Sequence, residues 1–185
     1  EDVTAGARLL EAGTLLRPQE IGLAAALGLT ELAVHAPLRV ALLSSGDELV
    51  GAGGALGQGQ VFDANRPILQ ALLRSLPAVV TDFGILPDSE EAVREALLAA
   101  SADHHVVLAS GGASHGDEDH VVRVVQAQGR LDFWQIAMKP GRPLAYGRIG
   151  GAHFFGLPGN PVSVMVTFYQ FVRDALFVLQ GRSGA

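Results

Sequence analysis

The chain has 185 residues, of which 49% are hydrophobic and 17% charged, with a formal net charge of -6 and no cysteine. This length is enough for one α/β core with a small appendage. The acidic balance argues against a nucleic-acid partner, and the lack of cysteine excludes disulfides, thiolate zinc sites and cysteine nucleophiles. No apolar run approaches the roughly 18 residues that cross a bilayer, so we expect no membrane partner. A cytoplasmic location is taken as the default.

The opening 38 residues differ from the rest of the chain, because they lack the apolar residues for a core of their own. Pro18 suits the first position of a helix and Gly28 suits its end, which predicts a helix of about three turns. Leu32 to Val34 favours a short strand. We expect residues 1–38 to belong to a neighbouring domain, or to pack on the main body as an arm, and residues 39–185 to form the main domain.

Beyond Arg39 the apolar pattern alternates between strands and helices, which favours a mostly parallel sheet covered by helices on both faces. The prediction is a three-layer αβα fold with a terminal β-hairpin. Strands are expected at Val40 to Ser44, Ala78 to Ile85, Val106 to Ala109 and Leu131 to Met138, and the hairpin at Pro143 to Arg148 with Ala152 to Leu157. Helices are expected at Pro67 to Leu76, Ser89 to Ala100 and Asp117 to Gln128, with a last, largely buried helix from Pro161.

Some polar residues are explained by helix capping alone. Asp88 is placed to cap the helix at Ser89, with Glu91 completing a capping box. Either Asp63 or Asn65 is placed to cap the helix at Pro67.

Polar groups follow four of the expected strands, at the points where those strands end. They lie in residues 44–48, at Asp88, in the loop from Gly111 to Asp119 and in residues 139–143. Because parallel strands end at the same edge of a sheet, we expect these loops to converge there on a ligand. Capping one helix needs neither a glycine pair nor three acids, so the loop from Gly111 to Asp119 indicates a phosphate and metal site.

The acidic residues limit what this edge can bind. A phosphate about 4 Å from a carboxylate is repelled by several kcal/mol, so an anion in such a pocket requires a bridging cation. Oxygen ligands without cysteine favour Mg²⁺, and a histidine site is disfavoured because His115 and His120 are five residues apart. Lys139, the chain's single lysine, and Arg142 supply positive charge. The pattern indicates phosphoryl or nucleotidyl chemistry.

A further helix start follows the hairpin. Asn160 is suited to the N-cap and Pro161 to the first helical position, so this turn offers free backbone amides to an anion. Pro158 and Gly159 precede the cap and form a turn that a plain helix start does not need.

Together these residues resemble one family, the molybdopterin molybdenumtransferases of molybdenum-cofactor biosynthesis, which include the MoeA proteins and the E domain of gephyrin. Residues 44–49 resemble its TGDEL motif, with Ser45 in place of threonine, and residues 63–65 its D-x-N. Residues 110–119 resemble SGGxSxGexD, residues 139–143 KPGKP and residues 157–163 LPGNPVS. Gln135 stands where some members have a second lysine. The loop at 110–119 has neither the TGGTG of molybdopterin adenylyltransferases nor the TGGLGPT of CinA-like proteins.

The resemblance implies a MoaB/Mog-like molybdopterin-binding fold that binds adenylylated molybdopterin. Molybdate is inserted and the adenylate is cleaved with Mg²⁺, releasing AMP. The implied catalytic residues are Glu48, Asp88, Asp119 and Lys139, of which the three acids hold the metal. The implied ligand-binding residues are Ser45, Gly46, Asp63, Asn65, Gly111, Gly112, Ser114, Gly116, Arg142, Pro158, Gly159, Asn160 and Ser163.

The resemblance also implies a longer protein. Residues 1–38 resemble the tail of an elongated dimerisation region, and the preceding regions and a C-terminal β-barrel are expected outside this sequence. The full-length family members are expected to form homodimers and to contact a molybdopterin adenylyltransferase. A non-catalytic pterin-binding or scaffold domain, and adenylyl transfer itself, remain as alternatives.

Overall fold

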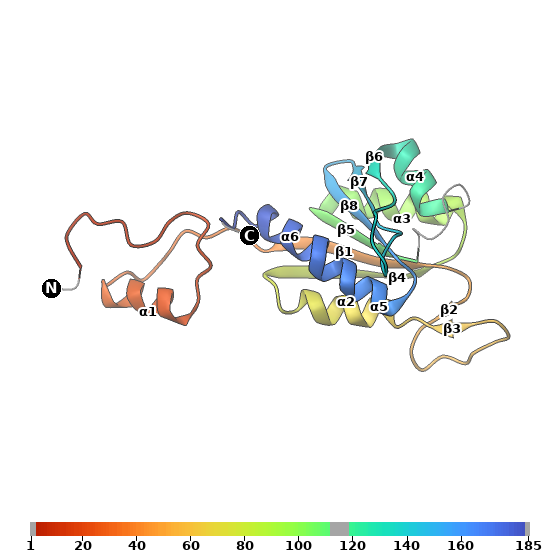
Figure 1. Cartoon of the computed structure of the whole chain (residues 1–185), viewed down its shortest axis with the longest axis horizontal. Helices are drawn as coiled ribbons and strands as arrows, with labels where there is room; N and C mark the ends of the chain where they lie inside the picture. Colours follow the sequence, from red (N-terminus) through yellow and green to blue (C-terminus); the bar gives the residue numbers. More distant parts are fainter. Residues whose placement is uncertain (1–2, 112–118, 184–185) are drawn as a thin grey trace.

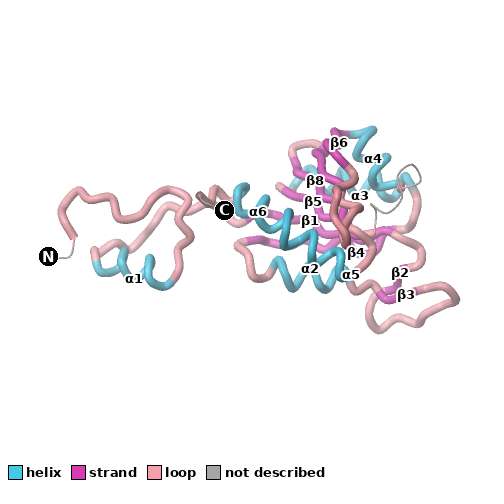
Figure 2. The backbone as a smooth tube through the Cα atoms, in the orientation of Figure 1, coloured by secondary structure: helices cyan, strands magenta, loops and turns pink. Residues whose placement is uncertain are grey.

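Six strands form the central sheet of the computed structural model, which describes residues 3–111 and 119–183 (Figures 1 and 2). The strands β4, β1, β5 and β8 are parallel, whereas β7 is antiparallel to β8 and β6 is antiparallel to β7. The expected α/β fold with a terminal hairpin is therefore confirmed. In sheet order the strands are β4 (Ala78–Leu86), β1 (Leu38–Ser45), β5 (Val106–Ser110), β8 (Ala152–Leu157), β7 (Ala145–Ile149) and β6 (Gly129–Phe133).

Helices cover both faces of this sheet, as the three-layer prediction requires. On one side α3 (Glu90–Asp103) and α4 (His120–Gln128) pack on the sheet, and Ala41 and Leu43 of β1 point to them. On the other side lie α2 (Asn65–Leu73) and the run of α5 (Pro161–Thr167), a π-helical turn (Phe168–Val172) and α6 (Arg173–Leu179). Val40 and Leu42 point to this second layer. Alternate side chains of β1 thus pack into two separate hydrophobic cores, one on each face of the sheet.

The carboxyl ends of the parallel strands meet at one edge. Ser44 of β1 is paired with Ser110 of β5, and Ser110 is paired with Leu157 of β8. β6 is antiparallel to β7, which is antiparallel to β8, so β6 also ends at this edge. A short parallel pair, β2 (Leu49–Val50) and β3 (Val61–Phe62), extends from it (Figure 1). We call this side of the sheet the ligand edge.

Two helix starts differ from the sequence prediction. Ser89, not Asp88, is the N-cap of α3, and its side chain accepts a hydrogen bond from the Ala92 N–H. The Asp88 carboxylate instead faces His120, with Oδ1 3.9 Å from Nε2, while the Asp88 N–H donates to Asp47 Oδ1, 41 residues away in sequence. The N-cap position of α2 is Ala64, which has no side-chain cap, and Asn65 is the first residue inside the helix. Asp63, one residue before Ala64, accepts from the Arg66 N–H through Oδ1.

The strand predicted at Leu131 to Met138 is too long. β6 ends at Phe133 because the chain then folds back on itself, with the Ile136 N–H donating to the Arg142 carbonyl at 2.9 Å. The segment from 134 to 144 is therefore an irregular loop at the ligand edge.

The terminal helical run is less buried than predicted. Val164, Phe168, Val172 and Leu176 pack on the sheet, whereas Val162 is 62% exposed and other apolar residues of the run also face outward. The stretch Pro161–Leu179 is long and apolar enough to cross a membrane, and a third of it is buried, whereas the sequence prediction had no apolar segment of that length. A helix that packs one side on a sheet can have the same length and mean hydropathy, and the Pro161–Leu179 run packs on the central sheet in this way.

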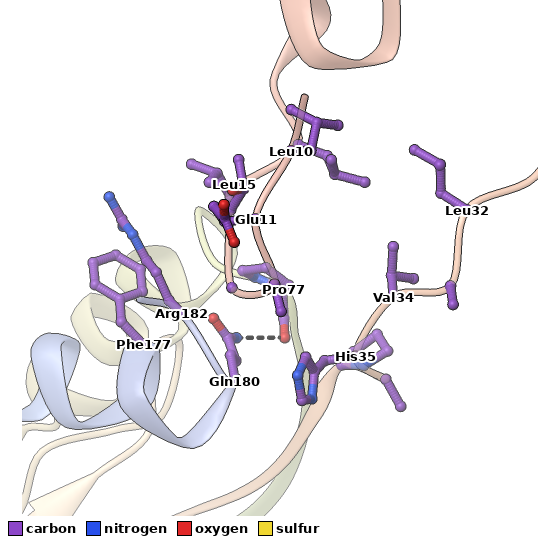
Figure 3. A pocket seen from close by; sticks show the side chains of 17 residues that line it. Leu10, Glu11, Leu15, Leu32, Val34, His35, Pro77, Phe177, Gln180 and Arg182 are labelled. Atoms are coloured by element: carbon purple, nitrogen blue, oxygen red, sulfur yellow. Dashed lines mark hydrogen bonds between the residues drawn. The ribbon is translucent and has the colours of Figure 1, made fainter. Parts of the chain in front are cut away.

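Residues 3–37 form an arm that extends away from the sheet (Figure 1). It contains α1 (Pro18–Ala26) and, contrary to prediction, no strand at residues 32–34, which form no backbone ladder with any described residue. The arm meets the body where the Ser183 N–H donates to the Gly13 carbonyl and His35 packs on Gly181. A cavity of about 610 Å³ lies at this junction, beside Pro37 and Pro77 at the amino ends of β1 and β4, and so opposite the ligand edge (Figure 3).

Candidate functional site

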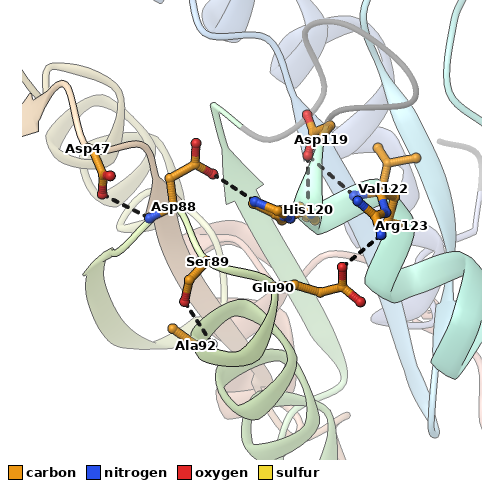
Figure 4. Close-up of polar contacts among 10 residues, drawn as sticks. Asp47, Asp88, Ser89, Glu90, Ala92, Asp119, His120, Val122 and Arg123 are labelled. Carbon is orange, nitrogen blue, oxygen red and sulfur yellow. Dashed lines mark hydrogen bonds and ion pairs between the residues drawn. The ribbon is translucent and has the colours of Figure 1, made fainter.

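Asp47, Asp88 and Asp119 lie on the α3 and α4 side of the ligand edge (Figure 4). Asp47 and Asp88 are joined by the hydrogen bond from the Asp88 N–H to Asp47 Oδ1, at 2.9 Å. Asp119 caps α4 by accepting from the N–H groups of Val121 and Val122. We call Asp47, Glu48, Asp88 and Asp119 the acidic half of the site.

His120 also belongs to this group, although the sequence argument disfavoured it as a functional residue. Its Nε2 lies 3.9 Å from Asp88 Oδ1, and the side chain is 26% exposed. The ring therefore lies between α4 and the loop that leads into α3 (Figure 4). An ion pair of 2.9 Å between Arg123 and Glu90 joins the same two helices.

Whether the acidic half can bind Mg²⁺ depends on how many of the ion's ligands the protein itself must supply. Among residues 3–111 and 119–183, no three histidine or acidic side chains lie close enough to hold a metal ion by themselves. The predicted set of Glu48, Asp88 and Asp119 is thus not a closed metal cage. Mg²⁺ is commonly bound through one or two carboxylates, waters and a substrate phosphate, however. The Asp88 side chain is 54% exposed, so the donors fit an ion of that kind.

The amide groups gather on the other side of the edge, above α2 and α5. Asn160 caps α5 as predicted, because its Oδ1 accepts from the N–H groups of Val162 and Ser163 at 3.0 and 3.3 Å. Asn65 Nδ2 donates to the Gly159 carbonyl at 2.8 Å and so joins the start of α2 to the turn before α5. We call Asn65, Gly159, Asn160 and Ser163 the amide half of the site.

The basic loop packs against this amide half. Gly141 is buried with φ +106°, and a Cβ there would lie 2.8 Å from Cγ2 of Thr167 in α5. Lys139 and Arg142 are exposed on either side of it. The Arg142 guanidinium donates to Gln135 Oε1 at 3.3 Å, so the glutamine at this position holds the arginine. The positive charges thus lie on a loop that is fixed to α5.

The two halves meet at the ends of β1 and β5. Gly111 has φ +93°, and a Cβ at this position would lie 2.6 Å from the Ser45 carbonyl oxygen, so the two loops touch through backbone. The Glu48 carboxylate folds over Gly46, within 2.8 Å of where a Cβ would be. The predicted residues Gly112, Ser114 and Gly116 lie outside the described residues.

Several buried polar atoms have no hydrogen-bond partner among the described residues. On the α2 side they are Oγ of Ser44 and Ser110, Oδ1 of Asn65 and Oδ2 of Asp63, which has only the 3.7 Å ion pair with Arg66, and on the α4 side Nδ1 of His120. Ser44 and Ser110 lie two residues after Leu42 and Leu108 in their strands and so share a face with these leucines. Both hydroxyls therefore point to the layer of α2 and α5. Leaving such a group unpaired costs about 1–3 kcal/mol, which proteins accept chiefly at functional sites.

Several of these residues were not singled out from the sequence. Ser44 and Ser110 lie inside the predicted motifs, and strand alternation would have found that they share a face. Asp47 was quoted in a motif without a role. No local signal identifies His120, because its contact with Asp88 depends on how α4 packs beside α3.

Comparisons with known proteins identify the family and the fold of this chain. The sequence model of a family described as "Probable molybdopterin binding domain" matches residues 41–177. A "Molybdopterin molybdenumtransferase" of Haemophilus influenzae is 44% identical over 182 residues, which cover 98% of this chain and 45% of that protein. The chain thus spans less than half the length of this relative.

Solved structures give the same picture for the fold. A molybdopterin biosynthesis MoeA protein of Pyrococcus horikoshii OT3 superposes with a TM-score of 0.80 at 30% identity, covering 100% of this chain and 44% of that one. The tungsten cofactor synthesizing protein MoaB of Pyrococcus furiosus superposes with a TM-score of 0.58 at 18% identity, covering 80% of this chain and 98% of that one. The second match concerns the fold alone.

Proposed function

Because this chain belongs to the family of molybdopterin-binding domains, we propose that it is the ligand-binding part of a molybdopterin molybdenumtransferase. The proposed substrates are adenylylated molybdopterin and molybdate. The observation that supports this most is the meeting of an acidic half, an amide half and a basic loop at one edge of the sheet. Such an edge suits a ligand with several anionic groups, because amides and cations hold it while carboxylates bind a metal ion.

The amide half and the basic loop are proposed to hold the substrate. Backbone N–H groups beside Gly159 and Asn160 and the charges of Lys139 and Arg142 suit phosphate oxygens or molybdate, because each is a donor to an anion. Ser45, Gly46, Gly111, Pro158 and Ser163 line the same edge.

The acidic half is proposed to serve the cleavage step, in which the adenylate is removed from molybdopterin as AMP while molybdate is inserted. Glu48, Asp88 and Asp119 would hold Mg²⁺ together with a substrate phosphate. The ion would neutralise charge on the phosphate oxygens. Lys139 is proposed to stabilise the charge that develops on the phosphate during cleavage, since such reactions depend mainly on positioning and electrostatics.

The proposal extends to the longer protein that the relatives represent. Residues 1–38 are assigned to a neighbouring dimerisation region and residues 39–185 to the ligand-binding domain. A homodimer, contact with a molybdopterin adenylyltransferase and a cytoplasmic location are proposed for the full-length protein.

Calorimetry with adenylylated molybdopterin, with and without Mg²⁺, tests the proposal. We expect Mg²⁺-dependent binding that Lys139→Ala and Asp119→Asn both weaken at least tenfold. If both variants bind as tightly as the unsubstituted chain, the roles proposed for Lys139 and Asp119 are wrong. Protein association without pterin affinity would favour a scaffold, and adenylylated product from molybdopterin and Mg-ATP would favour an adenylyltransferase.

A further inference from the structure

We propose that Asn65 is a positioning residue of the ligand edge, which acts by fixing the peptide between Gly159 and Asn160. The inference rests on the proposed function, since it concerns the same site. Asn65 is only 7% exposed, and its Nδ2 is used by the Gly159 carbonyl at 2.8 Å. The side-chain amide therefore binds the protein's own backbone.

The fixed carbonyl determines where a neighbouring donor points. The Gly159 carbonyl and the Asn160 N–H belong to one planar trans peptide, in which the two groups point in opposite directions. Holding the carbonyl toward α2 therefore turns the Asn160 N–H away from α2. Both Gly159 and Asn160 are exposed, so this peptide is at the surface where a ligand would lie.

Asn65 can fix the peptide because the start of α2 is itself held. Asp63 Oδ1 accepts from the Arg66 N–H at 3.1 Å, which orders the first turn of the helix. The Arg66 Nε lies 3.7 Å from Asp63 Oδ2 and 3.6 Å from Asp82 Oδ2, and the arginine side chain is 18% exposed. A largely buried cation thus ties α2 to β4.

A second tie from α2 to β4 provides a matched control. Gln70 Nε2 donates to Asp82 Oδ2 at 2.7 Å. Asn65→Asp and Gln70→Glu both exchange an amide for an acid of the same shape on α2, and both remove one hydrogen bond. Only the first of these bonds reaches the turn before α5.

The test compares binding of adenylylated molybdopterin to the 185-residue chain and to both variants, alongside thermal unfolding. Asn65→Asp is expected to weaken binding about tenfold or more, because a carboxylate facing the carbonyl of Gly159 turns the peptide. Gln70→Glu removes a more exposed bond, so it is expected to lower the unfolding temperature less than Asn65→Asp and to leave binding unchanged.

Amide resonances of the ligand-free protein separate positioning from direct contact with the ligand. Asn65→Asp is expected to shift the amide signals of Gly159, Asn160 and Val162, and Gln70→Glu is not. Unchanged signals, or wild-type affinity in Asn65→Asp, would overturn the inference. If the unsubstituted chain itself does not bind the pterin, the proposed function fails instead.

Discussion

The acidic and amide halves share one edge of the sheet but are built in different ways. In the acidic half the carboxylates of Asp47, Glu48 and Asp88 belong to exposed residues. In the amide half Asn65 and Ser163 are buried, and the Asn65 side chain joins the start of α2 to the turn before α5, whereas Gly159 and Asn160 are exposed. From this difference we infer that the acidic half is open to an ion or water, whereas the amide half holds a fixed shape.

Different consequences for substitution follow from this contrast. Removing an exposed carboxylate takes away charge at the site but little packing, so stability should change little. Removing a buried contact in the amide half should lower stability and ligand affinity together.

The largest effect is expected for Gly141→Ala. Gly141 has φ +106°, and a new Cβ would contact Met138 and the buried Thr167. Backbone strain and this contact together should cost about 3 kcal/mol of unfolding free energy. Gly59→Ala is the control, since Gly59 has φ +79° with no atom within 4 Å of a Cβ, and it should cost about 1 kcal/mol. Urea unfolding measures both, and equal losses would mean that the packing of the basic loop on α5 is not important.

A smaller effect is expected for Asn160→Ala. Loss of the N-cap of α5 should cost about 1–2 kcal/mol and also weaken binding of adenylylated molybdopterin. Ser89→Ala removes the N-cap of α3 and should cost about 1 kcal/mol with no change in binding. Calorimetry and urea unfolding of both variants check this, and a parallel loss of binding in Ser89→Ala would argue against the division into halves.

The smallest effect on stability is expected for Asp88→Asn, within about 0.5 kcal/mol. Binding in the presence of Mg²⁺ should nevertheless fall about tenfold, because a carboxylate proposed to hold the metal ion is lost. Glu90→Gln breaks the exposed pair with Arg123 and should leave binding unchanged. A large loss of stability in Asp88→Asn would contradict the view that this half is built for access.

Local patterns predicted much of this arrangement. The strands at Val40 and Val106, the hairpin around Gly150 and the Asn160 cap are all determined by residues close in sequence, through apolar alternation and cap chemistry. The convergence of the loops followed from parallel strands ending at one edge. These features need no knowledge of distant contacts.

The differences arise where a distant residue competes with a local one. Asp88 and Ser89 are both good caps, but the Asp88 carboxylate faces His120 of α4, and Ser89 caps α3. Asn65 looked like a cap or a ligand, and its actual partner, the carbonyl of Gly159, is 94 residues away. The terminal helix is apolar on most sides, but only the residues facing the sheet are buried.

The effect of Mg²⁺ on binding of adenylylated molybdopterin, measured for the unsubstituted chain, Asp88→Asn and Asn160→Ala, tests the division of the site most directly. We predict that Mg²⁺ strengthens binding by the same factor in the unsubstituted chain and in Asn160→Ala, although the latter binds more weakly throughout. In Asp88→Asn the strengthening should be lost. An equal Mg²⁺ effect in all three proteins, or its loss in Asn160→Ala alone, would contradict the account.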